Sequence, residues 1–407
     1  MSEDFSSIYT CDVVVVGGGT SVLSVASELK RLSVENVIVI EREIEAGGIP
    51  RHCGHYPFGL REYSRLLKGP QYAEKNVNKA INLGVDIWTG TTVTKIRPNA
   101  TLELLKNGQR ILVKANRAVL ATGARESSRS QRLIGGDRPE GIITTGALQS
   151  MVYLKKFKPF HNPVILGSEL VSFSAFQTCA HLGIKPVAII EEESQLRVRK
   201  IFHPYLFIKR VPVYLAVKNL KINGDSQVES ISFSSLSGEV VNIKTDGVII
   251  SGRFKAETQI VLSSHLEIDA GSGGPAVDQL GRCTDASFYA TGNILGQAES
   301  SDYCWKHGIK AAKRIKDDLL GKFKKSTSVS KVLCNDPAIK FVIPQRLSAP
   351  YENNSFRHFY VGLSKPINHQ ITLRTENSML WEGRVKAKPI RRLKIPFPEL
   401  RNYSSVI

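Results

Sequence analysis

The segment GGIPRHCGHYPFG, residues 47–59, contains side chains whose types and spacing could do chemistry. Cys53 follows His52 directly, and His55 lies two positions further on. A thiol between two imidazoles could ligate a metal ion, serve as a redox group, or line a cofactor that approaches the chain at the neighbouring glycines. His52, Cys53 and His55 are therefore the catalytic candidates, although the sequence gives none of them a definite role as acid, base or nucleophile.

The six cysteines of the chain are scattered and show no CxxC spacing. Zinc sites, iron–sulfur clusters and redox dithiols need grouped ligands or a resolving cysteine, so we predict no metal and no dithiol exchange. A single thiol beside a redox cofactor could still form a charge-transfer contact or a covalent adduct. We favour a packed cysteine as the interpretation of Cys53.

A strand–helix–strand pattern precedes this segment, in residues 12–42. Four consecutive valines lead into a glycine turn, an amphipathic helical segment follows, and a second strand ends at Glu41. The spacing is typical of a Rossmann dinucleotide-binding fingerprint. Gly17 permits the tight turn, Gly19 lets a diphosphate reach the helix N-terminus, and Glu41 can accept hydrogen bonds from ribose hydroxyls.

The third glycine of this fingerprint is missing, because Val22 occupies its position. That glycine normally lets the helix approach the strand closely. We therefore expect a slightly displaced helix or a looser hold on the cofactor.

A second strand–helix–strand unit begins near residue 160 and ends at the acids Glu191 to Glu193. Its turn keeps Gly167 but places Glu169 where a phosphate would come closest to the backbone. A carboxylate there adds bulk and repels a diphosphate. We favour a domain that has kept the fold and lost NAD(P)H binding; a modified site for NAD(P) or ATP is the alternative.

Two short strands end in Thr-Gly turns, RAVLATGARE (117–126) and SFYATGNIL (287–295). They resemble the segments that flank the flavin in flavoproteins with two dinucleotide-binding domains, which implies that the second turn lies near the diphosphate and ribityl chain of FAD. Asn293 replaces the acid usual in these proteins and can still hydrogen-bond ribityl hydroxyls. In the same proteins the backbone at a position like Val93 contacts adenine.

Four longer segments carry a more specific resemblance. They are residues 47–59, LKGPQYAEK (67–75), residues 120–149 and SGGPAVDQLGRC (272–283). They are similar to the FAD-binding smaller components of opine oxidase, hydrogen cyanide synthase and dye-linked L-proline dehydrogenase, within the pyridine nucleotide-disulfide oxidoreductase superfamily. The resemblance covers about residues 10–320.

This resemblance implies an FAD enzyme in which residues 47–59 form the flavin bed. It also implies that Thr145, Gly146 and Gln149 lie near the flavin or the domain hinge. The predicted cofactor-binding residues are Gly17, Gly18, Gly19, Thr20, Ser21, Glu41, Arg42, Gly47, Gly48, Arg51, His52, Val93, Ala121, Thr122, Gly123, Gly292 and Asn293.

The same resemblance implies that the partner is a second flavoprotein subunit and that the substrate is an amino acid, opine, amine or polyol, with electrons passing to a quinone or another acceptor. Many relatives carry a C-terminal cysteine cluster for an iron–sulfur centre, whereas Cys334 stands alone here. A separate iron–sulfur protein or a quinone is therefore the expected acceptor. Two alternatives stay open: an NAD(P)H-dependent FAD reductase, and a non-catalytic scaffold subunit that binds FAD or another nucleotide.

The chain of 407 residues carries a formal net charge of +18. No nucleic-acid-binding module is visible, so we expect no nucleic-acid partner. A docking face for an acidic protein, peripheral contact with an anionic membrane, and a generally basic proteome are the remaining explanations. The sequence shows no signal-peptide pattern and no membrane-spanning apolar run, so we expect a cytoplasmic protein. A peripheral position at the inner face of the membrane is the alternative.

These observations predict an α/β fold with two Rossmann-like FAD/NAD(P)-binding domains, the second inserted in the first, plus a small β-rich C-terminal appendage. We expect the first half of the FAD-binding domain at residues 10–152, the inserted domain at 153–258, the second half at 259–325 and the appendage at 331–407. Alternation of polar and apolar residues in the tail favours strands, whose expected task is docking.

Overall fold

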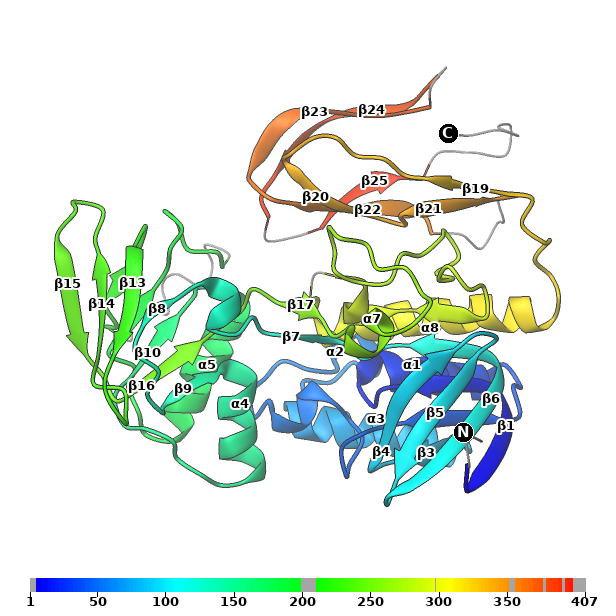
Figure 1. The fold of residues 1–407 in the computed structure, drawn as a ribbon, viewed down its shortest axis with the longest axis horizontal. Helices are drawn as coiled ribbons and strands as arrows, with labels where there is room; N and C mark the ends of the chain where they lie inside the picture. Colours follow the sequence, from blue (N-terminus) through cyan, green and yellow to red (C-terminus); the bar gives the residue numbers. More distant parts are fainter. Residues whose placement is uncertain are drawn as a thin grey trace.

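The structure is a computed structural model that describes residues 5–198, 210–296, 298–350, 356–375, 378–389 and 392–397. Figure 1 shows three units: a first domain around β1 (Ser7–Val16), an inserted domain beside it, and C-terminal strands that lie against α8 (Ser301–Leu319). No helix in the described part of the chain is long and apolar enough to cross a membrane.

The first domain contains a seven-stranded sheet in the order β3-β2-β1-β6-β5-β4, with β18 beside β6. The strands β1, β2, β3, β6 and β18 run parallel, whereas β4, β5 and β6 form an antiparallel meander. The other strands are β2 (Val37–Ile40), β3 (Asp86–Trp88), β4 (Thr91–Arg97), β5 (Thr101–Lys106), β6 (Gln109–Leu120) and β18 (Phe288–Ala290). The helices are α1 (Thr20–Arg31), α2 (Leu60–Tyr63), α3 (Gly69–Asn82), α7 (Gln259–Leu262) and α8, with short 3-10 turns η1 (Ile49–His52) and η5 (Gly292–Leu295).

The valines of β1 supply both faces of this sheet. Val13 and Val15 pack with α1 in one core, whereas Val14 and Val16 pack in the core on the opposite face. Successive strand residues point to opposite sides, and helices or other strands cover both sides of this sheet. The continuous apolar run in the sequence therefore reflects a strand buried on both faces.

Helix α1 approaches α8 closely through small residues. The hydroxyls of Ser21 and Ser24 donate to the carbonyls of Cys304 and Trp305, at 3.2 and 2.7 Å. A Cβ on Gly308 would lie 2.7 Å from the Cβ of Ser24, nearer than real side chains approach. Helix α8 therefore carries the glycine that this close contact between the two helices requires.

Val22, at the position of the missing glycine, is completely buried in the core that α1 forms with β1. A Cβ on Gly17 would lie 3.2 Å from one of its methyl groups. Helix α1 still begins directly after the turn, because the N–H of Leu23 bonds to the carbonyl of Gly19 at 3.0 Å. Val22 therefore fills the contact between the helix and the strand. The expected displacement of the helix, or a looser hold on the cofactor, stays a prediction.

The inserted domain contains a parallel sheet in the order β12-β11-β10-β16-β9 and a second sheet in the order β15-β14-β13-β8. Its strands are β8 (Gly135–Gly136), β9 (Ile142–Thr144), β10 (Pro163–Leu166), β11 (Ala188–Ile190), β12 (Val213–Tyr214), β13 (Lys218–Asn223), β14 (Ser230–Ser234), β15 (Val240–Lys244) and β16 (Gly247–Ile250). Its helical segments are η2 (Ser130–Arg132), α4 (Thr145–Gln149), η3 (Ser150–Leu154) and α5 (Leu170–His181).

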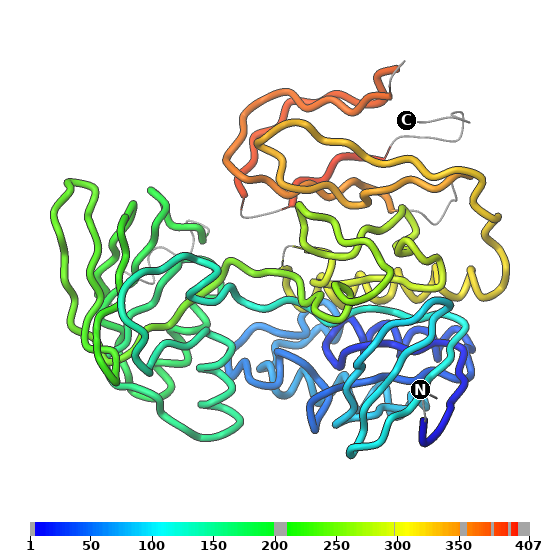
Figure 2. Tube along the Cα trace, in the orientation of Figure 1, coloured from blue at the N-terminus to red at the C-terminus, as the bar shows by residue number. Residues whose placement is uncertain are grey.

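The inserted domain begins before residue 153, the start predicted from the sequence. Strands β8 and β9 already belong to its two sheets, and Leu148 of α4 lies in its core. The chain crosses between the domains through β7 (Ala124–Arg125) and β17 (Lys255–Ala256), which pair in antiparallel fashion. Figure 2 shows these two crossings running together.

The C-terminal strands form three small antiparallel groups: β19 with β21, β20-β22-β25, and β23 with β24. Their bounds are β19 (Ser328–Lys331), β20 (Ile339–Ile343), β21 (Arg346–Ala349), β22 (His358–Leu363), β23 (Ile367–Arg374), β24 (Met379–Ala387) and β25 (Leu393–Pro396). The Tyr360 ring of β22 lies 5.7 Å from the His307 ring of α8, between centroids, so the strands pack on the first domain. The predicted fold class is confirmed.

We expect the substitution Val22→Gly to destabilise the protein, although it restores the third glycine of the fingerprint. It removes a buried side chain and places glycine in a helix interior, so the free energy of unfolding should fall by about 3 kcal/mol in urea titrations. The half-buried Glu28→Gly in the same helix is the control and should lose only about 1 kcal/mol. Equal losses in the two variants would contradict the packing role of Val22.

Candidate functional site

The glycines predicted to bind the cofactor meet where β1 ends. The N–H of Gly47 bonds to the carbonyl of Gly18 at 2.8 Å. Gly48 has a φ of 63°, and a Cβ there would lie 2.6 Å from the Cα of Gly19. The segment at residues 47–52 therefore contacts the glycine turn backbone to backbone, which only glycine at these positions permits.

The turn after β6 completes this edge of the sheet. The N–H of Ala121 bonds to the carbonyl of Val16 at 3.1 Å, and Gly17, with a φ of 112°, lies so close that a Cβ would be 2.9 Å from the carbonyl oxygen of Ala121. The hydroxyl of Thr122 donates to the carbonyl of Glu257 at 2.6 Å. The ends of two parallel strands are thus held in contact at the predicted site.

Two positions on this edge leave space for a ligand. A Cβ on Gly19 or on Gly123 would meet no atom of the described structure within 4 Å. Helix α1 begins at Thr20 with neither a side-chain cap nor an acidic residue in its first turn. Its first N–H groups and the positive end of the helix dipole therefore face this space, and the residues fit the diphosphate of FAD.

Glu41 faces the same turn from the end of β2. Its side chain is buried, and a Cβ on Gly18 would overlap its Oε2. Its Oε1 accepts the N–H of Glu43 at 2.8 Å. Burial raises the pKa of Glu41, and the hydrogen bond from Glu43 opposes that shift. A buried carboxylate with one oxygen toward the glycine turn is suited to a ribose hydroxyl.

The other predicted cofactor residues are placed less directly. The guanidinium of Arg42 lies 3.8 Å from Glu43, and that of Arg51 bonds to the carboxylate of Glu45 at 2.6 Å. Both arginines thus already pair with neighbouring acids, which sequence spacing does not show. Val93 lies in β4. This strand contacts the end of β2, because the N–H of Thr91 bonds to the carbonyl of Glu41 at 3.0 Å.

The second Thr-Gly turn contacts the first turn of α1. Gly292 has a φ of 77°, and a Cβ there would overlap the hydroxyl of Ser21. The Asn293 amide holds the following loop instead of pointing to an open space: its Oδ1 accepts the N–H of Glu299 at 2.9 Å, and its Nδ2 donates to the carbonyl of Glu299 at 3.3 Å. The predicted contact of Asn293 with the ribityl chain would have to replace these bonds.

His52 offers the bed a polar atom that is free to bind. Burial lowers the pKa of His52 to about 4, with Arg51 acting in the same direction, so the ring is neutral at physiological pH. Its Nε2 is buried and has no hydrogen-bond partner in the described structure. Such an atom can bind a polar group of a ligand.

Cys53 has the surroundings of a packed thiol. Its Sγ lies 3.4 Å from the carbonyl of Ile49 and 3.6 Å from Oε1 of Gln149. Burial raises the pKa of Cys53 to about 12, which keeps the thiol protonated and a poor nucleophile. His55 is held within its own loop, with Nδ1 2.9 Å from the carbonyl of Tyr56. Among the described residues no group of three or more His, Cys, Asp or Glu side chains is placed to hold a metal ion.

Glu126 is a central residue of the hinge that sequence analysis missed. Its carboxylate accepts the N–H of Gly252 at 2.9 Å and that of Gly146 at 2.8 Å, and it is buried. Burial raises the pKa of Glu126, while the two N–H groups lower it. This side chain ties both crossings to the start of α4, so Gly146 lies at the hinge, as the resemblance implied.

The crevice of the inserted domain, where a second nucleotide would bind, already contains the protein's own side chains. The Ser168 hydroxyl donates to Glu191, the acid at the ribose position, at 2.5 Å. Glu169 accepts the N–H of Arg253 at 3.1 Å and lies 3.5 Å from the guanidinium of Arg197. Three groups that a dinucleotide would contact are therefore occupied.

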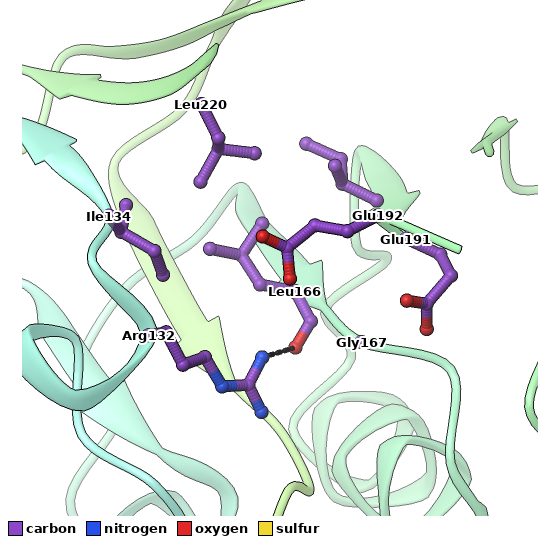
Figure 3. Close-up of a pocket in the computed structure, with 8 residues that line it drawn as sticks. Arg132, Ile134, Leu166, Gly167, Glu191, Glu192 and Leu220 are labelled. Atoms are coloured by element: carbon purple, nitrogen blue, oxygen red, sulfur yellow. Dashed lines mark hydrogen bonds between the residues drawn. The ribbon is translucent and has the colours of Figure 1, made fainter. Parts of the chain in front are cut away.

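Arg132 fills the same crevice from the connection that follows the hinge. Figure 3 shows its guanidinium beside the end of β10, where it donates to the carbonyl of Leu166 at 3.3 Å. It also donates to the carbonyl of Ser251 at the end of β16. Glu191 and Glu192 line the remaining space with it. The residues present do not fit NAD(P)H, in agreement with the doubt raised by Glu169.

A family comparison identifies this architecture. A profile described as pyridine nucleotide-disulphide oxidoreductase matches residues 11–313. The chain belongs to this family. It is therefore an FAD-dependent oxidoreductase, and FAD is the cofactor that the glycine turn, Glu41 and the α1 N-terminus fit. When bound, FAD supplies the redox chemistry that these side chains lack.

Solved structures with the same fold include two thioredoxin reductases. That of T. acidophilum is 21% identical with a TM-score of 0.65, over 76% of this chain and 99% of that one. That of Lactococcus lactis is 18% identical with a TM-score of 0.62, over 76% and 99%. The L-proline dehydrogenase of P. horikoshii is 18% identical with a TM-score of 0.59, over 79% of this chain and 57% of that one. At these identities the likeness shows the fold alone, and no curated protein sequence matches the chain.

We expect Gly19→Ala to weaken FAD binding without unfolding the protein. The new Cβ meets no atom of the chain within 4 Å, yet it projects into the space predicted for the diphosphate. FAD affinity should fall by about tenfold or more, about 1.4 kcal/mol, in titrations of the apoprotein. Gly123→Ala is the comparison. Its Cβ is equally unobstructed, but its φ of 84° strains the backbone of any residue other than glycine, so this variant should lose folding stability, unlike Gly19→Ala. Unchanged FAD affinity in Gly19→Ala would contradict the placement.

The lowered pKa of His52 should make the folded protein sensitive to acid. Between the ordinary value of 6.5 and about 4, the unfolded imidazole binds a proton that the folded one does not, so stability should fall as the pH drops through this window. His52→Gln should therefore lose less stability than wild type when thermal midpoints are compared across the window. The exposed His161→Gln is the control and should follow wild type; parallel curves for all three proteins would contradict a buried neutral His52.

Proposed function

We propose that this chain is the FAD subunit of a dehydrogenase complex that oxidises an amino acid, opine, amine or polyol. The observation that carries the proposal is the filled crevice of the inserted domain. Ser168, Glu169 and Arg132 there use the partners that NAD(P)H would need. A reductase supplied by NAD(P)H requires this crevice to be open, so electrons reach the flavin from another donor.

The cysteines favour the same conclusion. A disulfide substrate needs an attacking thiolate and a second thiol within reach. All six cysteines lie within the described residues, and none of them forms a disulfide. The raised pKa of Cys53 also keeps that thiol protonated. Reduction of a disulfide is therefore a poor use of this site.

The chain's own residues have defined tasks in the proposed reaction. The open N-terminus of α1 holds the diphosphate, and Glu41 binds the adenosine ribose. His52 stays neutral beside the bed and offers Nε2 to the cofactor or substrate, while Glu126 fixes the hinge. These residues bind and orient the cofactor, and FAD supplies the redox chemistry.

The partner and acceptor in this proposal come from the family resemblance. The six cysteines form no cluster, which supports a quinone or a separate iron–sulfur protein as the acceptor. A second flavoprotein subunit supplies the substrate site in this proposal. The solved structure of similar fold named L-proline dehydrogenase supports an amino acid as the first substrate class to test. The cytoplasmic location stays a prediction.

We expect the yellow protein to keep its oxidised flavin spectrum when NADH or NADPH is added without oxygen. Bleaching should instead require the substrate together with the second flavoprotein, coexpressed from a neighbouring gene and tested first with L-proline and a dye acceptor. The measurement is the visible flavin absorbance in rapid mixing. Dithionite is the positive control, because it should bleach the flavin of any folded, FAD-loaded preparation.

Glu169→Gly tests whether this carboxylate alone keeps NAD(P)H out of the crevice. Because Arg132 and the Ser168–Glu191 bond remain, this variant should still resist reduction by both nucleotides, as should Glu229→Gly at an exposed site in the same domain. Rapid bleaching of the wild-type flavin by NADH or NADPH would overturn the proposal in favour of an NAD(P)H-dependent reductase. A complex that keeps full activity when its Gly19→Ala subunit has been prepared free of FAD would favour the scaffold alternative.

A further inference from the structure

Exposed apolar side chains gather around the flavin bed, on both sides of the contact between the two domains. Their exposed fractions lie between 43% and 61%. They are Ile49, Tyr56, Leu60 and Leu66 of the first domain with Leu154 and Phe157 of the inserted domain. We call this surface, together with its cations, the basic–apolar patch. The cations are Arg61, Arg65, Lys68, Lys155, Lys156 and Lys158.

Contacts between the two domains bring together the segments that carry these residues. A Cβ on Gly54 would overlap the ring of Tyr153, so the bed and η3 touch. The Nζ of Lys68 lies 5.8 Å from the centre of the Tyr56 ring. A β-bridge pairs Phe58 with Leu67 and brings the two ends of the loop around α2 together. Each of the six apolar residues of the patch lies within five positions of one of these contact residues along the chain.

The patch is strongly positive. Its two segments, residues 49–68 and 150–158, contain one acidic residue, Glu62. The Glu62 side chain is 2% exposed and pairs with Lys79 at 2.9 Å, so it adds no negative charge to the surface. Arg61 lies 3.8 Å from Asp302 of α8, and the exposed cations of the patch otherwise come from segments without an exposed acid.

We propose that the basic–apolar patch docks this protein on an anionic lipid bilayer. Cations alternate with Leu, Phe and Tyr within single turns, as in LREYSRLLK (60–68) and YLKKFK (153–158). Lysine is depleted in protein–protein interfaces, whereas interfacial membrane segments combine Lys and Arg with Leu and aromatic residues. A formal net charge of +18 adds attraction to an anionic surface. The composition therefore favours lipid over a protein partner.

Docking through this patch would turn the bed with His52 and Cys53 toward the bilayer. Apolar electron acceptors such as quinones dissolve there, so the orientation suits the proposed function. The binding itself does not depend on the substrate or the acceptor. A failure of the proposed function and a failure of this inference can therefore be measured separately.

The test is co-sedimentation of the FAD-loaded protein with vesicles of phosphatidylcholine containing phosphatidylglycerol, and with vesicles of phosphatidylcholine alone. We expect binding to the anionic vesicles only, weakened by salt. Lys155→Glu/Lys158→Glu and, independently, Leu66→Asp/Phe157→Asp should each reduce the partition coefficient by about tenfold or more. The flavin spectrum and circular dichroism should match wild type in both variants.

Matched controls use exposed residues of the inserted domain away from the bed. Lys218→Glu/Lys244→Glu makes the same change in net charge as the lysine variant. Leu236→Asp/Val240→Asp replaces two apolar side chains that are at least as exposed, at 82% and 72%. Both controls should bind vesicles almost as wild type does. Equal loss in the controls would show a diffuse charge effect and overturn the patch. Absence of wild-type binding to anionic vesicles would overturn the inference outright. So would patch variants that keep vesicle binding but no longer co-elute with the coexpressed flavoprotein, because the occupant would then be a protein.

Discussion

The site depends on one contact, the meeting of two backbones at Gly48 and Gly19. A side chain on Gly48 would lie 2.6 Å from the Cα of Gly19, so the bed can reach the glycine turn only while position 48 lacks one. The same turn touches Ala121 at the end of β6 and faces Glu41 at the end of β2. One strand order therefore brings three distant segments around a space that the N-terminus of α1 makes favourable for an anion.

The inserted domain shows what happens to this arrangement when the turn gains side chains. Gly18 faces the carboxylate of Glu41 in the first domain, whereas Ser168 at the matching position bonds to Glu191. Gly19 is open, whereas Glu169 reaches the backbone of Arg253. Strands, helix and acid are retained in both units. The same topology thus leaves one ligand site available and satisfies the other internally, through the side chains of Ser168 and Glu169 together with Arg132.

Sequence patterns predicted the parts of this molecule that depend on local order. The four valines before Gly17, the acid at the end of the second strand and the repeat of that pattern near Gly167 were enough for two Rossmann-like domains, and the family and FAD are confirmed. Asn293, by contrast, is engaged with Glu299, and Arg51 with Glu45. Such pairings depend on how a loop closes, which spacing does not reveal.

The features that the sequence could not predict depend on contacts between distant residues. Glu126 bonds to Gly252, which is 126 positions away, and β9 pairs with β16 across about a hundred residues, so neither the hinge nor the true start of the inserted domain has a local signal. The effect of the missing third glycine is also decided by packing. Val22 fills the contact between α1 and β1 that a glycine would leave open, whereas the separate contact between α1 and α8 depends on Gly308. A departure from a motif is therefore best judged from the contacts that the replacing side chain makes in the folded protein.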